Sequence, residues 1–208
     1  MNPHDLIRVL SRVGLRAEAE KVRLNELDCT MGVGSYGTNI ANGFRAVRQS
    51  LHGLEGDLTI DRVFLTAGQA FLSAAGGDIG LLIGSMLSDT GKAFRGRVTF
   101  GAEEAVWMLE IMEQALVRHG KAQLGDKTML DGLHPAVVAA RAAGGEDVVE
   151  ILCRAAEAAS AGARATSKMT SRLGRSSLVD EFAPGHEDAG ANSIAMILRG
   201  LEEEVTAL

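Results

Sequence analysis

The chain has 208 residues, of which 46% are hydrophobic and 23% charged, so it is long enough for a single domain with a full core. A net charge of −6 without an extended basic cluster argues against a nucleic-acid partner, and no apolar run reaches the roughly 18 residues that would span a membrane. Two cysteines, Cys29 and Cys153, cannot form the disulfide framework of a secreted protein. We therefore expect one domain over residues 1–208 in a cytoplasmic protein.

Apolar periodicity predicts about eight helices, and no segment shows the alternation typical of a strand. The first helix is expected from Pro3, capped by Asn2, to about Leu27. The others are expected over about 38–51, from Thr59 to the Gly76-Gly77 break, over about 80–94, and from Thr99, Asp126, Glu146 and Gly190 onward. Because short links favour antiparallel neighbours, we predict an all-α, up-and-down barrel or bundle of eight helices with the ligand site at one end.

The segment "DCTMGVGSYGTNIANGF", residues 28–44, interrupts the helical pattern with four glycines. Gly32, Gly34 and Gly37 precede Thr38 and Asn39, which open the next apolar-periodic run. This pattern is typical of a loop whose backbone approaches a ligand at a helix N-terminus. A working phosphate loop, a phosphate loop that has lost its function and a plain turn are all consistent with it.

Three further breaks carry weaker signals. "AAGGDIGLLIG", residues 74–84, is explained by a helix C-cap and a tight turn, and "HGKAQLGDKTMLDG", residues 119–132, by an ordinary N-cap. "SRLGRSSLVDEFAPGHEDAGANS", residues 171–193, is the longest irregular segment, and such segments are usually functional or disordered. All of these breaks fall at helix ends, and alternate loops of an up-and-down bundle share one end of the molecule.

Taken together, these motifs resemble the nucleotide-binding L subunit of dihydroxyacetone kinase. The resemblance extends from "LNELD" to "AMILRGL", and its most specific pieces are "GKAQLGDKTMLD", "GRSS" and "GHEDAGANS". It implies an eight-helix antiparallel barrel that holds ADP or ATP at one mouth. It also implies a K-type partner subunit that binds a small ketose, with phosphate supplied by ATP or by a phosphocarrier protein. The ketose, the phosphodonor and the oligomeric state are left open.

The resemblance also implies which residues form the site. In the family, three aspartates of the first loop bind two magnesium ions that hold the phosphates. Asp28 matches the first aspartate, but Val33 and Ser35 stand at the other two positions, and Tyr36 stands at the family's histidine. The positions expected at the nucleotide are Tyr36, Gly37, Thr38, Asn39, Gly76, Gly77, Asp78, Gly120, Met129, Arg175, Asp188 and Gly190.

Two functions follow from these residues. The retained motifs favour a kinase subunit, a phosphotransferase component. Val33 and Ser35 are poor ligands for magnesium, so they argue against metal-dependent catalysis and favour a non-catalytic binding or regulatory protein. Asp78 has two interpretations: a relocated metal ligand, or a residue that caps the helix beginning near Gly80. No residue is assigned a catalytic role from the sequence.

Overall fold

The computed structural model describes residues 1–30, 34–173 and 185–208, which contain helices and no strand. The predicted all-α class is therefore confirmed. The helices of the described part are α1 (Pro3–Ala19), α2 (Lys21–Cys29), α3 (Tyr36–His52), α4 (Ile60–Ala75), α5 (Gly77–Ala93), α6 (Ala102–Gly120), α7 (Met129–Ala142), α8 (Val148–Ala165), a 3₁₀ turn η1 (Thr166–Lys168) and α9 (Ala189–Thr206).

The first expected helix is divided into α1 and α2 at Glu20. Glu20 keeps helical dihedral angles, and its N–H still donates to the Arg16 carbonyl oxygen at 2.9 Å. The start of α1 is as expected: Asn2 Oδ1 accepts from the Asp5 N–H, and Asp5 Oδ2 accepts from the Asn2 N–H, each at 3.0 Å. This reciprocal pairing satisfies two backbone donors that the helix leaves without partners.

Two helix starts lie two residues later than expected. Gly101, not Thr99, is the N-cap of α6, because the Glu104 carboxylate accepts from the Gly101 N–H at 2.9 Å. Thr128, not Asp126, is the N-cap of α7. In both cases an acidic side chain in the first turn reaches back to the cap, a signal that competes with the more obvious cap residues in the sequence.

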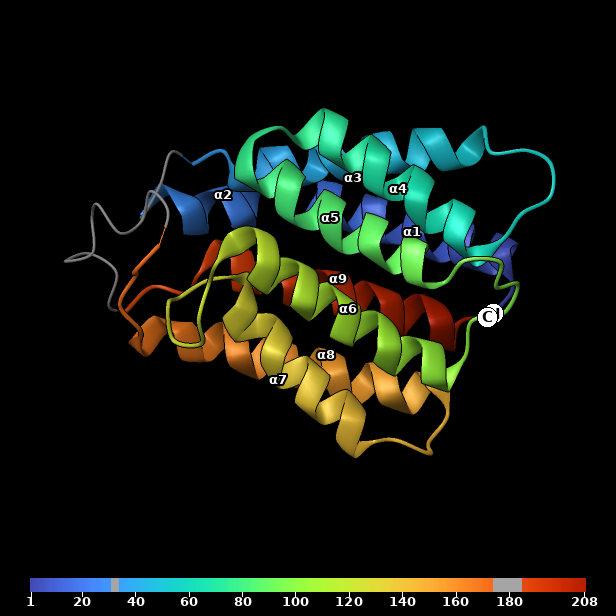
Figure 1. Cartoon of the computed structure of the whole chain (residues 1–208). Coiled ribbons are helices and arrows are strands. Elements are labelled where there is room, and N and C mark those ends of the chain that lie inside the picture. The colour runs from blue at the N-terminus through green and yellow to red at the C-terminus, as the bar shows by residue number, and fades with distance from the viewer. Residues whose placement is uncertain (31–33, 174–184) are drawn as a thin grey trace.

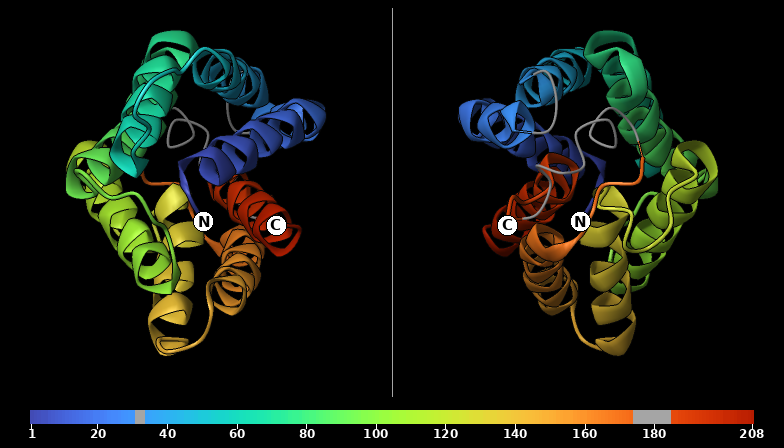
Figure 2. Two further views of the ribbon diagram at one scale, coloured as in Figure 1. Left: turned by 90° about the vertical axis from the view of Figure 1, so that its right-hand side faces the viewer. Right: turned by 90° about the vertical axis from the view of Figure 1, so that its left-hand side faces the viewer.

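In the described part of the chain, eight of the α-helices, all except α2, close into a ring around a central axis (Figure 2). Each of α1, α3, α4, α5, α6, α7, α8 and α9 packs against the next in this order, and α9 packs against α1. The up-and-down course brings the N-termini of α3, α5, α7 and α9 to one end of the barrel, together with α2. Both ends of the chain lie at the opposite end (Figure 1).

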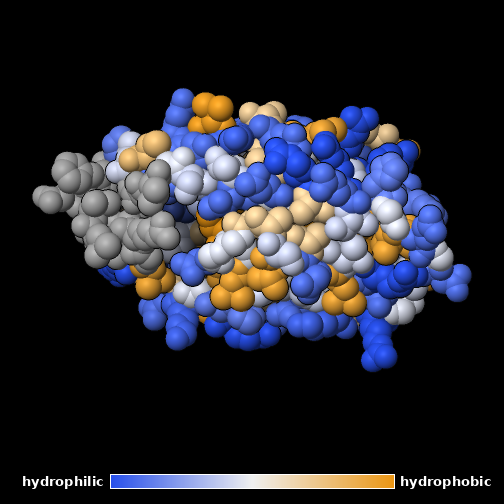
Figure 3. Space-filling view, turned by 90° about the horizontal axis from the view of Figure 1, so that it is seen from above, coloured by the Kyte–Doolittle hydropathy of each residue, from blue (hydrophilic) through white to orange (hydrophobic). Residues whose placement is uncertain are grey.

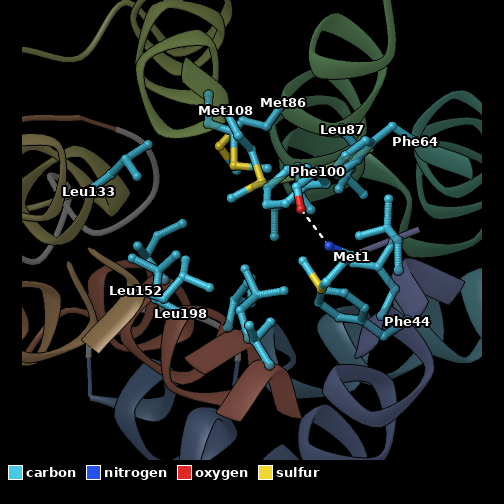
Figure 4. A pocket seen from close by; sticks show the side chains of 18 residues that line it. Met1, Phe44, Phe64, Met86, Leu87, Phe100, Met108, Leu133, Leu152 and Leu198 are labelled. Atoms are coloured by element: carbon cyan, nitrogen blue, oxygen red, sulfur yellow. Dashed lines mark hydrogen bonds between the residues drawn. The ribbon is translucent and has the colours of Figure 1, made fainter. Parts of the chain in front are cut away.

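The axis of the barrel is apolar (Figure 4). A cavity of about 40 Å³ lies there, and it is lined by Met, Leu, Ile, Val and Phe side chains such as Phe44, Met86, Met108 and Leu198. The Met1 nitrogen donates to the Phe100 carbonyl oxygen at 2.7 Å, and this contact lies beside the cavity. We expect the cavity to be dry, because an ordered water needs two or more polar partners.

The face of the barrel seen in Figure 3 is mostly hydrophilic. On the face seen in Figure 3, a pale strip of weakly polar and apolar residues runs between hydrophilic ones. A shallow groove on α3 and α4 is lined mainly by small side chains, including Ala46, Ala70 and Ala74. Among the described residues, no helix combines the length and the apolar character that a membrane span requires.

Helices α7 and α8 pack closely together at Gly162. Pro135, within α7, has no N–H to donate to the Asp131 carbonyl oxygen one turn earlier. Gly162 of α8 packs directly over this carbonyl, and a Cβ at residue 162 would overlap it and lie 3.1 Å from Pro135 Cγ. The absent side chain is therefore a requirement of the contact between the two helices.

Gly162→Ala is expected to lower the free energy of unfolding by about 1–3 kcal/mol, because backbone atoms must move to admit the methyl group. The direction of the change in free energy of unfolding is informative, since Gly→Ala within a helix normally stabilises by up to about 1 kcal/mol. Urea denaturation monitored by circular dichroism measures the effect. Gly53→Ala is the control: a Cβ there meets no atom within 4 Å. Equal stability of the two variants would show that the α7–α8 contact tolerates a side chain.

Candidate functional site

A pocket of about 700 Å³ opens at the end of the barrel where the four helix N-termini gather. Its volume lies within the range of small-molecule sites. Most of the residues expected at the nucleotide line it, together with Asp28, the expected metal ligand: Tyr36, Asn39, Gly76, Gly77, Asp78, Gly120, Met129, Asp188 and Gly190. The prediction of a single site built from separate loops thus corresponds to one continuous pocket.

Two expected residues face away from this pocket. Gly37 packs against α2, where a Cβ would overlap the Lys21 carbonyl oxygen. Thr38 pairs with Asn25 of α2: its N–H donates to Asn25 Oδ1, and Asn25 Nδ2 donates to its hydroxyl oxygen, each at 3.0 Å. These residues fasten α3 to α2. Arg175 and Val33 lie outside the described residues.

One side of the pocket is apolar. Leu81, Leu82, Leu116 and Ala122 line it together with Met129. Gly120 is adjacent, and a side chain there would lie 3.2 Å from Leu82 Cδ2. These apolar side chains suit a flat apolar ring.

Asp28 forms the cap of α3. Its Oδ2 accepts from the Ser35 N–H at 2.9 Å and from the Tyr36 N–H at 3.1 Å. A carboxylate at this position also compensates the positive end of the helix dipole. The N–H groups of Ser35, Tyr36 and Thr38 at the start of α3 are therefore paired with side chains of the protein itself, Asp28 and Asn25.

Tyr36 connects α3 to α9. Its hydroxyl lies 2.9 Å from Ser193 Oγ, and Ser193 Oγ donates to the Gly190 carbonyl oxygen at 2.7 Å. Because the serine proton goes to Gly190, the tyrosine is the donor to Ser193. Removal from water raises the pKa of Tyr36 far above its ordinary value of 10.0, so the phenol stays neutral.

The N-terminus of α5 differs from that of α3. Gly76 and Gly77 have φ values of 66° and 55°, which favour glycine, and no side chain caps this helix. Asp78 lies in its first turn and is exposed. Its carboxylate is suited to the helix dipole but makes no capping hydrogen bond, so it is not the cap that one interpretation of the sequence foresaw.

Lys127 was not among the expected site residues, although it lies in the motif "GDKTM". It lines the pocket and is 1% exposed. Its Nζ donates to the His186 carbonyl oxygen at 2.7 Å and to the Met169 carbonyl oxygen at 3.3 Å. A positive φ of 62° turns the chain there. This rare conformation for a lysine is not readable from the sequence.

Asp188 caps α9 at the pocket, and its Oδ1 accepts from the Ala191 N–H at 2.6 Å. Its own N–H donates to Thr166 Oγ1 at 2.8 Å. Removal from water raises the pKa of this carboxyl from 3.8 to about 7, and the charge of Asp131 adds to the shift while Lys127 opposes it. Asp188 is therefore close to half-protonated at neutral pH.

The pair of magnesium ions implied by the resemblance does not fit these residues. Oδ2 of Asp28 is occupied by two backbone N–H groups, and the neutral hydroxyl of Tyr36 is bonded to Ser193. Among residues 1–30, 34–173 and 185–208, no three His, Cys, Asp or Glu side chains are grouped to hold a metal ion. Magnesium prefers carboxylate and phosphate oxygens, and Val33 and Ser35 stand at two of the three expected aspartate positions, so the pair of ions lacks most of its expected carboxylate ligands.

The raised pKa of Asp188 makes stability depend on pH. Since the folded protein holds this proton more tightly than the unfolded chain, stability from this group falls as pH rises from about 4 to about 7. Asp188→Asn keeps the capping oxygen and removes the charge. The difference in free energy of unfolding between the variant and the wild type should therefore shift in favour of the variant as pH is raised from 5 to 7.5. Urea denaturation at the two pH values measures this difference.

The matched control for this experiment is Asp147→Asn, which changes the exposed N-cap of α8 at the other end of the barrel. It should show no such gain between the two pH values. If Asp188→Asn behaves like Asp147→Asn, the carboxyl of Asp188 is ionised throughout this range.

Comparison with known proteins supports the sequence resemblance. The DAK2 domain matches residues 30–203. The ADP-binding subunit DhaL of PEP-dependent dihydroxyacetone kinase 2 from Listeria innocua is 32% identical over 202 residues, which cover 95% of this chain and 92% of the relative. The corresponding DhaL subunit from Escherichia coli is 30% identical over 198 residues, 94% of each chain.

The fold is similar to that of the dihydroxyacetone kinase of C. freundii. The structure of that enzyme with AMP-PNP and Mg²⁺ superposes with a TM-score of 0.73 at 26% identity, over 95% of this chain. The present chain spans 33% of the C. freundii chain. From the match over residues 30–203, and from the two relatives similar along almost their whole length, the chain belongs to the DAK2 domain family.

Proposed function

We propose that the pocket binds an adenine nucleotide, ADP or ATP, and that the chain is the nucleotide-binding subunit of a dihydroxyacetone-type kinase. The observation that carries this proposal is similarity over nearly the full length of two subunits described as ADP-binding. The pocket supports it, since an apolar side beside Met129 suits adenine and the helix N-termini suit phosphate.

Different residues of the pocket would contact the base and the phosphates. Leu82, Leu116 and Met129 would contact the base, and Gly120 would leave room beside it. The backbone at Gly76 and Gly77 would face the phosphates at the N-terminus of α5. Arg175, which the sequence resemblance assigns to the nucleotide, remains part of the proposal.

A kinase of this kind also needs a place for its second substrate. This chain is about a third as long as the C. freundii enzyme, and its DhaL relatives are subunits. We therefore propose a separate K-type subunit that holds the small ketose, with ATP or a phosphocarrier protein as the phosphodonor. In this proposal the complex works in the cytoplasm.

A second candidate function is favoured by one specific observation. Asp28 caps α3 and Tyr36 is bonded to Ser193, so two groups at the expected metal side of the pocket serve the fold. This arrangement favours a non-catalytic binding or regulatory protein. An assay of phosphate transfer to dihydroxyacetone, with a K-type subunit and a phosphodonor, distinguishes the two: transfer supports the kinase subunit, and nucleotide binding without transfer supports the regulatory protein.

Calorimetric titration with ADP tests whether the pocket is the nucleotide site. Leu82→Trp places a bulky ring on the apolar side, and we expect it to weaken ADP binding by about tenfold or more, equivalent to roughly 1.4 kcal/mol. The control is Val138→Trp, on the exposed face of α7 and outside the pocket, which should leave binding unchanged. If both variants bind ADP like the wild type, the nucleotide binds elsewhere.

A further inference from the structure

The N-termini of α3 and α5 both border the pocket but offer different chemistry to an anion. At α3 the N–H groups of Ser35 and Tyr36 donate to Asp28, and that of Thr38 donates to Asn25. A phosphate could take these donors only by displacing side chains of the protein. The N-terminus of α5, at Gly76 and Gly77, has no side-chain cap. The pocket thus leaves one helix N-terminus open to one anionic group.

Charge around the pocket does not favour several phosphates. Asp28, Asp78 and Asp188 line the pocket, and Lys127 is the lysine among its described lining residues. The Nζ of Lys127 is directed at the carbonyl oxygens of Met169 and His186. Each further phosphate would add negative charge near carboxylates, with Lys127 already engaged by the backbone.

A divalent cation would normally offset this repulsion, but among the described residues no three His, Cys, Asp or Glu side chains are grouped to hold one. Asp28 uses Oδ2 to hold the backbone of α3, and the neighbouring Tyr36 presents a neutral hydroxyl that donates to Ser193. The contact between Tyr36 and Ser193 also joins α3 to α9 without any bound ion. The mouth of the barrel is therefore held together by contacts within the protein.

We propose that the pocket binds its nucleotide without a divalent cation, and that its affinity falls as the number of phosphates rises from AMP through ADP to ATP. This proposal rests on the adenine nucleotide assigned to the pocket above. The adenosine part and one phosphate at the N-terminus of α5 account for the favourable contacts. The second and third phosphates meet Asp78 and the other carboxylates of the mouth.

Calorimetric titration of the full chain with adenosine, AMP, ADP and ATP tests the proposal, first with excess chelator and then with excess magnesium, at constant ionic strength and pH 7.5. AMP is expected to bind about tenfold or more tightly than ATP in chelator, because like charges within a few ångströms repel even near the surface. Magnesium should leave the affinity for AMP unchanged.

Asp78→Asn provides the test at the level of one residue. Removing this carboxylate should raise the affinity for ATP in chelator by about threefold to tenfold, an effect that weakens as salt is added. The matched control is Asp61→Asn, which removes a carboxylate from the first turn of α4 at the opposite end of the barrel. That variant should bind ATP like the wild type.

The other outcomes are distinguishable. Affinity that rises with phosphate number and disappears in chelator would overturn the metal-free proposal while supporting the assignment of the nucleotide. Loss of magnesium-dependent affinity in Asp78→Asn would likewise overturn it and identify Asp78 as a metal ligand. If no adenine compound binds under either condition, both the proposed function and this inference are wrong.

Discussion

The chemistry of the pocket follows from the positions of four helix N-termini. An up-and-down ring sends α3, α5, α7 and α9 away from the same end, so that end collects their unpaired N–H groups and the positive ends of their dipoles. The protein compensates three of them with acidic side chains: Asp28 at α3, Asp131 at α7 and Asp188 at α9. The N-terminus of α5 has no such cap. The N-terminus of α5 is therefore where we propose that a phosphate of the ligand binds.

The same constraint explains why carboxylates surround a pocket that is expected to bind an anion. Asp28, Asp131 and Asp188 cap helices, because a helix end buried without a partner for its N–H groups is unfavourable. Partial burial then raises the pKa of Asp188 to about 7, with the charge of Asp131 contributing. Each additional negative charge on the ligand is therefore repelled by carboxylates that cap helices of the barrel.

Much of this arrangement could be predicted from the sequence. The 3.6-residue periodicity predicts the helices, and the glycine-rich breaks indicate which loops share one end. The sequence did not indicate which side chains at the start of α3 face the pocket and which face α2. Tyr36 and Asn39 lie three residues apart and share the pocket face, whereas Gly37 and Thr38, rotated by about 100° per residue, face α2. A sequence motif alone does not distinguish the helix face that lines the pocket from the face that packs against a neighbouring helix.

Tyr36 illustrates how the fold and the ligand preference become linked. In the family resemblance its position belongs to a histidine in a metal-binding loop, but here the side chain joins α3 to α9 through Ser193. A mouth that depends on metal ions must keep several carboxylates close together until the ions arrive, which costs stability through their mutual repulsion. In this chain Val33 and Ser35 stand at two of the expected aspartate positions, which removes that repulsion, and the neutral pair of Tyr36 and Ser193 joins α3 to α9 without an ion. In the metal-free binding that we propose, the pocket is formed without an ion and does not have the positive charge with which an ion would attract phosphates.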